Sequence, residues 1–515
     1  MRKRPTIFKW KYLFVLIPLL VYLTSLTQYW ICSDDSALYI YQARSYYLTG
    51  VFTQNGQPNL VASPGFPMLI AGLMKIGGDS NYFFMQSVMV LCGLGGLAIA
   101  YRQQWIWTTR FRARWVVLGT TMSYCFYHNI RRVLTEAPSF LLFWLIIALL
   151  RASKTNKWYL VLTALAGYAA VFTRIPATLA IASIGVAALF ERRLVSDKFH
   201  WRFLGVCVLA LGVIAGWLHV RFIASAYQQI APYSSSGSFF NFEDPWSTVV
   251  DNVGRMFSHL CLGQRNCAVG LVILTLIVWA GLYCHRHRNR KLVFPIAFIV
   301  AYSTLMISSV GGWTMTSRYW FYALPLVIYY LFKAIELMGG LATKALRLRR
   351  ALLPLPKFAA IGICVLVLIQ LPLIVRSNFV AMYGWGHSRE QFYKKFNHGR
   401  NAEIMSLVDE LAMEKSRAWI ATSGKTTILL AFTGRYVHCL GKEPLDVIRS
   451  EQWREHPPAV VLLERPKSTD DASDMQVHRQ LMDVFGADRE HWALDRETER
   501  WLVFRRKIGQ AQAGR

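Results

Sequence analysis

The stretch SDDSALYIYQARSYYLTG, Ser33–Gly50, follows a hydrophobic run and opens with two adjacent aspartates. Carboxylates are costly beside lipid, so two of them at the end of an apolar segment need an explanation. Asp35 or Ser36 can cap a helix that continues through ALYIYQARSYYL. On that helix Tyr39 lies four residues after Asp35 and shares its face. An aspartate held at the membrane–water boundary can act as a general base, and a plain helix cap is the alternative interpretation.

The composition is that of a membrane protein. Of the 515 residues, 54% are hydrophobic and 14% are aromatic, with a mean hydropathy of +0.30. An ordinary soluble chain is less apolar. The net charge of +28 raises the question of nucleic acid. However, the lysines and arginines form short clusters between apolar runs, without zinc-finger spacing or a basic helix with heptads. We therefore expect the lipid bilayer as a partner, and no nucleic acid.

Apolar runs predict about eleven membrane-spanning helices. The third to sixth runs are short or abut one another. The predicted spans are Tyr12–Tyr29, Tyr82–Tyr101, Trp115–Tyr127, Ser139–Leu150, Trp158–Phe172, Ile175–Phe190, Phe203–Phe222, Val269–Tyr283, Leu292–Ser309, Tyr319–Met338 and Phe358–Val375.

The charges between these runs predict the orientation. If the runs alternate in direction, the basic segments MRKRPTIFKWK, RFRAR, RASKTNK, ERRLVSDK, HRHRNRK and KALRLRR all fall on one side. The positive-inside rule makes that side cytoplasmic, with the N-terminus inside and the C-terminus outside. The first run is of span length and lacks a cleavage site, so it reads as a retained helix. No Asn-x-Ser/Thr sequon occurs, which favours a bacterial inner membrane over the endoplasmic reticulum.

The chain divides into two parts. Residues 1–375 form the membrane domain, with long outer loops at 31–81 and 226–266, and residues 376–515 form a periplasmic tail. In the tail, RAWIAT, RYVHCL, AVVLLE and RWLVFRR have the pattern of short strands, whereas NAEIMSLVDELAMEK and SGKTTILLAFTG have that of helices. The predicted fold class is therefore an α-helical multi-pass membrane protein with a small C-terminal α/β domain.

The GKT in the tail does not predict a nucleotide site. A phosphate-binding loop needs a glycine five residues before the second glycine, and that position is Trp419. Among the nine cysteines, Cys261 and Cys267 in HLCLGQRNC fall on the outer side. An oxidising compartment would allow a disulfide between them, and two unpaired thiols are the equal alternative.

Further charged residues fall at the outer ends of predicted spans. RRVLTEAPSFLLF carries Arg131 and Glu136, FTRIPATL carries Arg174, and TMTSRYWFYALP carries Arg318 and Tyr319. Individually, each arginine can simply snorkel at the interface, and Glu136 can simply suit a helix dipole. Together with the two aspartates they converge on one face of the membrane. Arginines there can hold a phosphate leaving group bidentately while a carboxylate deprotonates a hydroxyl, so we expect a lipid-anchored phosphate substrate.

The segment SPGFPMLIAGLMKIGG predicts one more element of this face. A proline suits the first turn of a helix, and the apolar run of about ten residues is too short to span. It therefore predicts an interfacial or re-entrant helix.

The order DSALYIYQA, YYLTG, SPGFPMLIAGLMKIGG, LTEAPSFLLF, FTRIPA and SRYWFYALP resembles the polyprenyl-phosphate-dependent glycosyltransferases of the type C fold. It is similar to the bacterial branch that includes protein mannosyltransferases, lipid A aminoarabinose transferases and Rgt-like lipopolysaccharide sugar transferases. The resemblance covers most of residues 10–340. It implies an inverting transfer of a sugar from a polyprenyl-phosphate donor, and a tail that helps to bind the acceptor.

The resemblance also implies roles for residues. The base maps to Asp35, with Asp34 adjacent, and the second outer acid to Glu136. Arg318 and Arg174 are expected near the donor phosphate. Many members have Asp-Glu where this chain has Asp-Asp, which leaves open whether Asp34, Asp35 and Glu136 hold a divalent metal. The helical spacing to Tyr39 favours Asp35 as the base.

We therefore expect a glycosyltransferase on the periplasmic face, acting on a hydroxyl of a glycan, glycolipid or protein. A lipid-linked glycan transporter is the first alternative, although it would place polar groups near the bilayer midplane. An accessory protein without activity is the second.

Overall fold

The computed structural model describes residues 13–30, 34–54, 57–58, 63–79, 81–107, 109–174, 176–190, 204–206, 208–209, 212–213, 246–263, 265–286, 293–310, 318–345, 355–388, 391–392, 420–423, 437–440, 444–455, 457–465, 472–488, 490–497 and 501–507. The predicted span Phe203–Phe222 and the first half of the second outer loop therefore lie largely outside the described residues. The same holds for the two predicted tail helices and the GKT segment.

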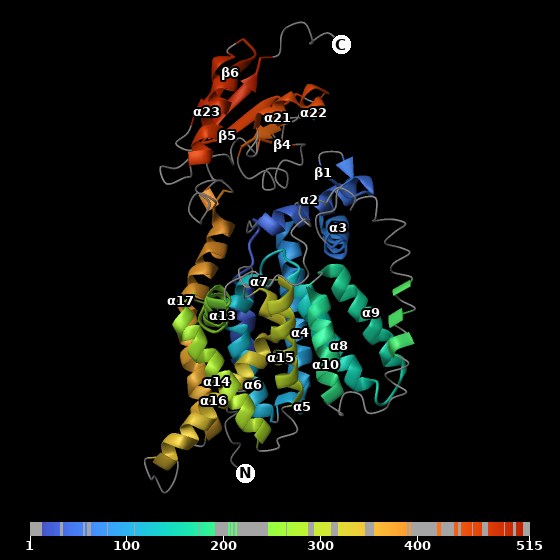
Figure 1. Cartoon of the computed structure of the whole chain (residues 1–515), viewed down its shortest axis with the longest axis vertical. Coiled ribbons are helices and arrows are strands. Elements are labelled where there is room, and N and C mark those ends of the chain that lie inside the picture. The colour runs from blue at the N-terminus through green and yellow to red at the C-terminus, as the bar shows by residue number, and fades with distance from the viewer. Residues whose placement is uncertain are drawn as a thin grey trace, which may run out of the picture.

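The first part of the chain is a bundle of helices, as predicted (Figure 1). Every predicted span that the structure describes contains a helix, although the helix of the first span ends at Leu23, and the helices keep the order of the apolar runs. The helices are α1 (Leu13–Leu23), α2 (Asp34–Thr49), α3 (Gly65–Gly77), α4 (Tyr82–Arg102), α5 (Gln104–Trp107), α6 (Arg110–Thr121), α7 (Tyr124–Ile130), α8 (Glu136–Ala152), α9 (Trp158–Thr173), α10 (Ala177–Phe190), α13 (Trp246–Leu262), α14 (Cys267–Arg286), α15 (Val293–Val310), the 3₁₀ helix η5 (Tyr319–Ala323), α16 (Leu324–Ala345) and α17 (Leu355–Gly386).

Several of these helices are long and apolar enough for a membrane protein. The number of spans, about eleven, stays a prediction. In the described part of the chain, three helices are long and apolar enough to cross a membrane, and one bent pair passes the same test together. Those helices are Tyr82–Arg102, Trp320–Thr343 and Leu355–Gly386, with the pair Val250–Leu262 and Cys267–Tyr283. Several of the other predicted spans are apolar helices of fewer than 18 residues.

Two predictions of detail are wrong. The run Trp115–Tyr127 is not one helix, because α6 ends at Thr121 and Ser123 caps α7 by accepting a hydrogen bond from the Phe126 amide. The helix of the opening stretch begins at Asp34, so Asp35 and Ser36 lie within its first turn instead of capping it. The Ser36 hydroxyl instead accepts a hydrogen bond from Trp30 Nε1 at 3.1 Å.

The disulfide between Cys261 and Cys267 is not formed. Both residues are free thiols, and Cys261 is fully buried inside the bundle. Cys261 lies in α13 and Cys267 begins α14, and the two helices pack closely as a sharply bent pair. The packing of this helix pair is thus maintained without a covalent link.

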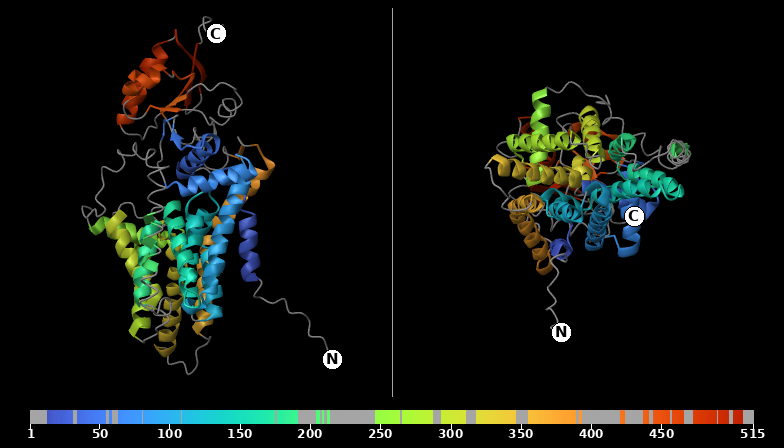
Figure 2. Two further views of the ribbon diagram at one scale, coloured as in Figure 1. Left: turned by 90° about the vertical axis from the view of Figure 1, so that its right-hand side faces the viewer. Right: turned by 90° about the horizontal axis from the view of Figure 1, so that it is seen from below.

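Two short helices lie at the end of the bundle nearest the C-terminal sheet (Figures 1 and 2). They are α2 and α3, the helices predicted from the opening stretch and from SPGFPMLIAGLMKIGG. They pack against each other, and the ring of Tyr39 meets the ring of Phe66 edge-on at 5.0 Å between centroids. Helix α17 continues past the predicted boundary at residue 375, to Gly386.

The C-terminal region contains the predicted α/β element. Its five-stranded sheet has the order β4-β3-β5-β7-β6, with β4, β3 and β5 parallel and the other pairs antiparallel. The strands are β3 (Ile420–Thr422), β4 (Val437–Cys439), β5 (Val460–Glu464), β6 (Trp492–Glu497) and β7 (Trp501–Arg506), with helices α21 (Pro444–Arg449), α22 (Glu451–Glu455) and α23 (Ala472–Ala487). A two-residue ladder, β1 (Thr53–Gln54) with β2 (Gln57–Pro58), follows α2.

Candidate functional site

Glu136 anchors a group of charged side chains where the bundle meets α2 and α3. It is the first residue of α8, where the positive end of the helix dipole favours a carboxylate, and its side chain is 0% exposed. Its Oε1 accepts a hydrogen bond from Arg318 Nε at 2.5 Å and lies 3.3 Å from Arg174 Nη2. Its Oε2 accepts a hydrogen bond from the Thr135 hydroxyl at 3.4 Å. Two guanidiniums therefore compensate for the burial of one carboxylate.

Arg318 extends this group to the opening stretch. Its Nη1 donates a hydrogen bond to Asp35 Oδ2. The result is an alternating series, Arg174–Glu136–Arg318–Asp35, which we call the ion chain. Arg174 and Glu136 are 8% and 0% exposed, whereas Arg318 is 33% and Asp35 49% exposed. The ion chain therefore has a fixed inner end and an accessible outer end.

The four members come from four separate elements. Arg174 caps the C-terminus of α9, where its amide donates to the Ala170 carbonyl at 2.9 Å. Arg318 immediately precedes η5, and Asp35 lies in the first turn of α2. Residues 283 positions apart in sequence thus share one hydrogen bond, and the structure brings these four of the predicted residues into contact.

Helix α3 holds the outer elements against α9. Gly65, its first residue, lies so close to α9 that an added Cβ would fall 2.6 Å from the Phe172 carbonyl oxygen. Only glycine allows this approach. Phe172 is two residues before Arg174, so the contact fixes the end of α9 from which the arginine projects.

Tyr39 borders the ion chain and keeps its proton. Burial, reinforced by the Glu136 carboxylate, raises the pKa of Tyr39 to about 12. The phenol is therefore neutral at physiological pH and can donate a hydrogen bond but cannot act as a base.

Arg131 is placed differently from the other predicted arginines. It is 5% exposed, and its Nη1 donates to the Tyr127 hydroxyl at 3.1 Å and to the Ser377 carbonyl at 3.3 Å. Tyr127 in turn donates to Asn378 Oδ1 at 2.5 Å. These contacts tie α7 to α17, which is a packing role, and its assignment to the donor phosphate stays a prediction.

The remaining predicted residues belong to the same elements. Asp34 begins α2 and Tyr319 begins η5, but their side chains lie outside the described residues. Two residues near the ion chain, Ser139 and Tyr322, were not predicted as site residues. Both are fully buried, and Tyr322 lies beside Arg174 and Ser139. The helical spacing offered the signal, since Ser139 follows Glu136 by three positions and Tyr322 follows Arg318 by four.

The described carboxylates do not fit a metal site. Arg318 bridges Asp35 and Glu136, so a guanidinium occupies the position between them where a cation would lie. In the described ranges, no group of three or more His, Cys, Asp or Glu side chains can hold a metal ion. Hard divalent cations need several oxygen ligands at once.

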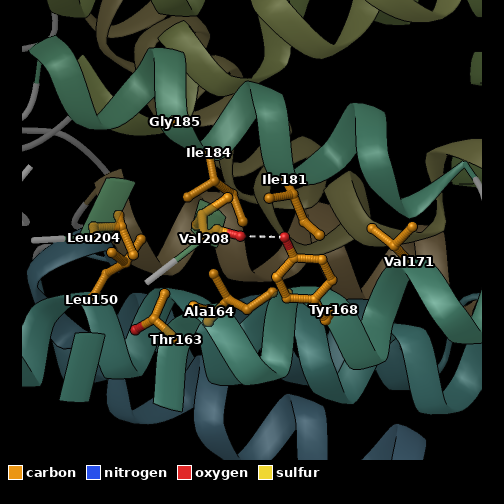
Figure 3. Close-up of a pocket in the computed structure, with 12 residues that line it drawn as sticks. Leu150, Thr163, Ala164, Tyr168, Val171, Ile181, Ile184, Gly185, Leu204 and Val208 are labelled. Atoms are coloured by element: carbon orange, nitrogen blue, oxygen red, sulfur yellow. Dashed lines mark hydrogen bonds between the residues drawn. The ribbon is translucent and has the colours of Figure 1, made fainter. Parts of the chain in front are cut away.

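An apolar cavity of about 260 Å³ lies between α9 and α10 (Figure 3). Ile181, Ile184 and Gly185 of α10 face Ala164 and Tyr168 of α9 across it. The remaining lining residues are Ile146, Leu150, Thr163, Gly167, Val171, Leu204 and Val208. The Tyr168 hydroxyl donates to the Val208 carbonyl. Along α9 the lining positions 163, 164, 167, 168 and 171 form one face, which ends one turn before Arg174.

No protein-family model and no curated protein sequence matches the chain. Among solved structures, it is similar to ArnT from Cupriavidus metallidurans in the apo state, with a TM-score of 0.56, 15% identity and coverage of 96% of this chain and 97% of that chain. For ArnT from Cupriavidus metallidurans bound to undecaprenyl phosphate, the TM-score is 0.58 at 14% identity, covering 97% and 98%. An oligosaccharyltransferase from Archaeoglobus fulgidus has a TM-score of 0.48 at 9% identity, covering 88% and 68%. The likeness to ArnT, over nearly the whole of both chains, confirms the predicted type C glycosyltransferase fold.

Proposed function

We propose that this chain, which has the type C glycosyltransferase fold, is a membrane glycosyltransferase that moves a sugar from a polyprenyl-phosphate donor to a hydroxyl of a glycan, glycolipid or protein. The observation that carries the proposal is the ion chain, in which two guanidiniums and an accessible carboxylate meet at one end of the bundle. A phosphate and a general base are the two things that such a set can supply together.

Asp35 is the base in this proposal. Its half-exposed carboxylate takes the proton of the acceptor hydroxyl, and the oxygen attacks the anomeric carbon of the donor. The bond from that carbon to the phosphate oxygen breaks, and its electron pair stays on the phosphate. One displacement of this kind inverts the anomeric centre, so no covalent enzyme intermediate is required.

Arg318 and Arg174 hold the phosphate in this proposal, and Glu136 positions them. A planar guanidinium binds phosphate oxygens in pairs and neutralises the charge that develops as the sugar leaves. Glu136 is fully buried and touches both arginines, so it orients both groups without reaching the substrate itself.

The apolar cavity suits part of the lipid chain of the donor. It runs along the face of α9 that leads to Arg174, so a phosphate at that arginine would have an apolar path for the first isoprene units. ArnT, with the same fold, has been solved bound to undecaprenyl phosphate.

We further propose that the protein lies in a bacterial inner membrane with about eleven spans and a cytoplasmic N-terminus. The site and the tail at residues 376–515 would then face the periplasm. Figures 1 and 2 support this arrangement, since α2, α3 and the C-terminal sheet lie at the same end of the bundle. The tail would help to bind the acceptor.

The purified protein in lipid nanodiscs, supplied with undecaprenyl-phosphate hexoses and pentoses, tests this function. Release of undecaprenyl phosphate is followed with a mixture of glycan, lipid and peptide acceptors. We expect release by the native protein and its loss in Asp35→Asn. Full activity of both Asp35→Asn and Asp34→Asn would show that the base is assigned wrongly.

A transporter of lipid-linked glycans is the second candidate, favoured by a separate group of buried charges. Glu336 of α16 accepts hydrogen bonds from Arg112 at 2.9 and 3.1 Å and from Lys333 at 2.6 Å. Charged groups inside membrane helices often mark transport pathways. Flipping of a labelled lipid-linked sugar in sealed proteoliposomes, without donor cleavage, would favour this candidate over the transferase.

A further inference from the structure

Arg318 divides its guanidinium between two carboxylates of different character. Its Nε donates to Glu136, which is 0% exposed, and its Nη1 donates to Asp35, which is 49% exposed. Because the two bonds use different nitrogen atoms, the guanidinium can release Asp35 while Glu136 still holds it. The buried contact acts as a pivot, and the exposed contact is the one that a ligand can replace.

In this arrangement the Asp35 carboxylate is already engaged, because its Oδ2 accepts a hydrogen bond from Arg318 Nη1. A carboxylate oxygen that a guanidinium holds is not free to accept a hydrogen bond from an acceptor hydroxyl. The residue that must accept a proton in the proposed reaction is therefore held by the residue that must bind phosphate. Both demands are met only if Arg318 changes partner.

We propose that Arg318 exchanges Asp35 for the phosphate of the lipid donor, so that donor binding frees the base. This inference rests on the proposed function. Before binding, Nη1 of Arg318 holds the Asp35 carboxylate. In the donor complex, Nη1 faces a phosphate oxygen and Nε remains on Glu136, which leaves Asp35 available for the acceptor hydroxyl.

The exchange also balances the charges of the transfer step. The donor phosphodiester carries one negative charge, and the phosphomonoester that remains carries up to two. As the carbon–oxygen bond breaks and the phosphate gains a charge, Asp35 gains the proton of the acceptor and loses its own charge. The total charge around Arg318 therefore stays constant while its location moves from the aspartate to the phosphate.

A double-mutant cycle on undecaprenyl phosphate binding tests the exchange. Affinity is measured in nanodiscs of zwitterionic lipid for the native protein, Asp35→Asn, Arg318→Ala and the double variant. We expect Asp35→Asn to bind about fivefold more tightly, the size of a partly exposed ion pair, because Arg318 is then free before the ligand arrives. In the Arg318→Ala background the same substitution should change the affinity little.

The cycle separates this exchange from simple repulsion between Asp35 and phosphate, since repulsion would persist without Arg318. The control is Asp251→Asn, which removes a carboxylate from the exposed Asp251–Arg255 pair of α13 and should leave affinity unchanged. Asp35→Ala serves as a second variant if Asp35→Asn does not fold. An Asp35→Asn protein that binds no more tightly, or a gain that survives Arg318→Ala, overturns the inference. If the native protein binds no undecaprenyl phosphate, the proposed function fails as well.

Discussion

At the scale of single residues, replacing Glu136 tests whether this carboxylate holds Arg318 and Arg174 in place for phosphate binding. Glu136→Gln removes the charge that holds Arg318 and Arg174 in place, and breaking such a buried pair costs about 3 kcal/mol. We expect a lower unfolding temperature and a loss of undecaprenyl phosphate affinity, because both guanidiniums lose their orientation.

Glu336→Gln is the matched control for this variant. It breaks a second buried cluster, with Arg112 and Lys333, that shares no residue with the ion chain. It should lower the unfolding temperature to a similar degree while leaving the affinity for undecaprenyl phosphate unchanged. Equal affinities of the Glu136→Gln variant and the native protein for undecaprenyl phosphate would contradict the positioning role of Glu136.

Tyr39 should act only as a neutral hydrogen-bond donor. Its pKa is raised to about 12, so the phenol keeps its proton at every pH below that value, and no titration of this group should appear between neutral and about pH 10. We expect Tyr39→Phe to lower kcat by up to about tenfold, the value of one neutral hydrogen bond, without changing the shape of the pH–rate profile. Disappearance of an alkaline limb in the variant would contradict this role.

Much of the site follows from the sequence at this scale. Four predicted residues each lie at an end of an apolar run on the same predicted side: Asp35, Glu136, Arg174 and Arg318. The predicted orientation of the runs is therefore enough to bring them to one face of the membrane. Arg131 satisfies the same criterion but instead contacts Tyr127 and α17. Which of several arginines at one face pair with a carboxylate depends on how distant helices pack, which the pattern of a single chain does not contain.

At the scale of elements, the contact between α3 and α9 positions Arg174. Gly65→Ala would place a methyl group 2.6 Å from the Phe172 carbonyl oxygen, and the backbone must move to relieve the clash. We expect reduced donor cleavage because the end of α9 shifts. Gly72→Ala, in the same helix with open space around the position, should be neutral or slightly stabilising, since alanine favours helix by about 1 kcal/mol over glycine. Equal activity of the two variants would exclude the positioning role of α3.

The apolar cavity can be filled from one position. An added Cβ at Gly185 meets no atom within 4 Å, so Gly185→Leu extends into the cavity without a clash. We expect about tenfold weaker binding of undecaprenyl phosphate, the cost of excluding roughly two methylene groups, and a smaller effect on a short-chain prenyl phosphate. Gly205→Leu, equally free of close neighbours but not among the lining residues, is the control. Identical effects on long and short chains would argue against a lipid chain in the cavity.

Elements were predictable where their pattern was regular. The two short helices and four of the five strands were expected at their observed places. Strand β6 was not, because WALDRE carries charged, exposed residues at the edge of the sheet and lacks the apolar run of its neighbours. The break between α6 and α7 was hidden because the apolar run continues through Met122 and Ser123, and only the serine cap marks it.

At the scale of the whole molecule, the C-terminal sheet and the ion chain lie on the outer side in the proposed orientation. In a background whose native cysteines are replaced, Glu451→Cys in the tail should react with a membrane-impermeant maleimide added to intact spheroplasts. Thr155→Cys, in the exposed turn between α8 and α9, should react only after the membrane is permeabilised. Labelling of Thr155→Cys from outside would reverse the orientation.

The global fold was predictable because the order and sides of short motifs resemble one fold family, and the likeness to ArnT confirms it. The number of spans was harder to predict. Several apolar helices of the bundle are shorter than a bilayer requires, and hydropathy alone does not distinguish a span from a buried helix of the same composition.

A structure of the protein with bound undecaprenyl phosphate tests the central claim most directly. We predict that the phosphate lies within hydrogen-bond distance of Arg318 and Arg174, with Arg318 still on Glu136 and no longer on Asp35. A phosphate bound elsewhere, with the Arg318–Asp35 pair intact, would contradict it.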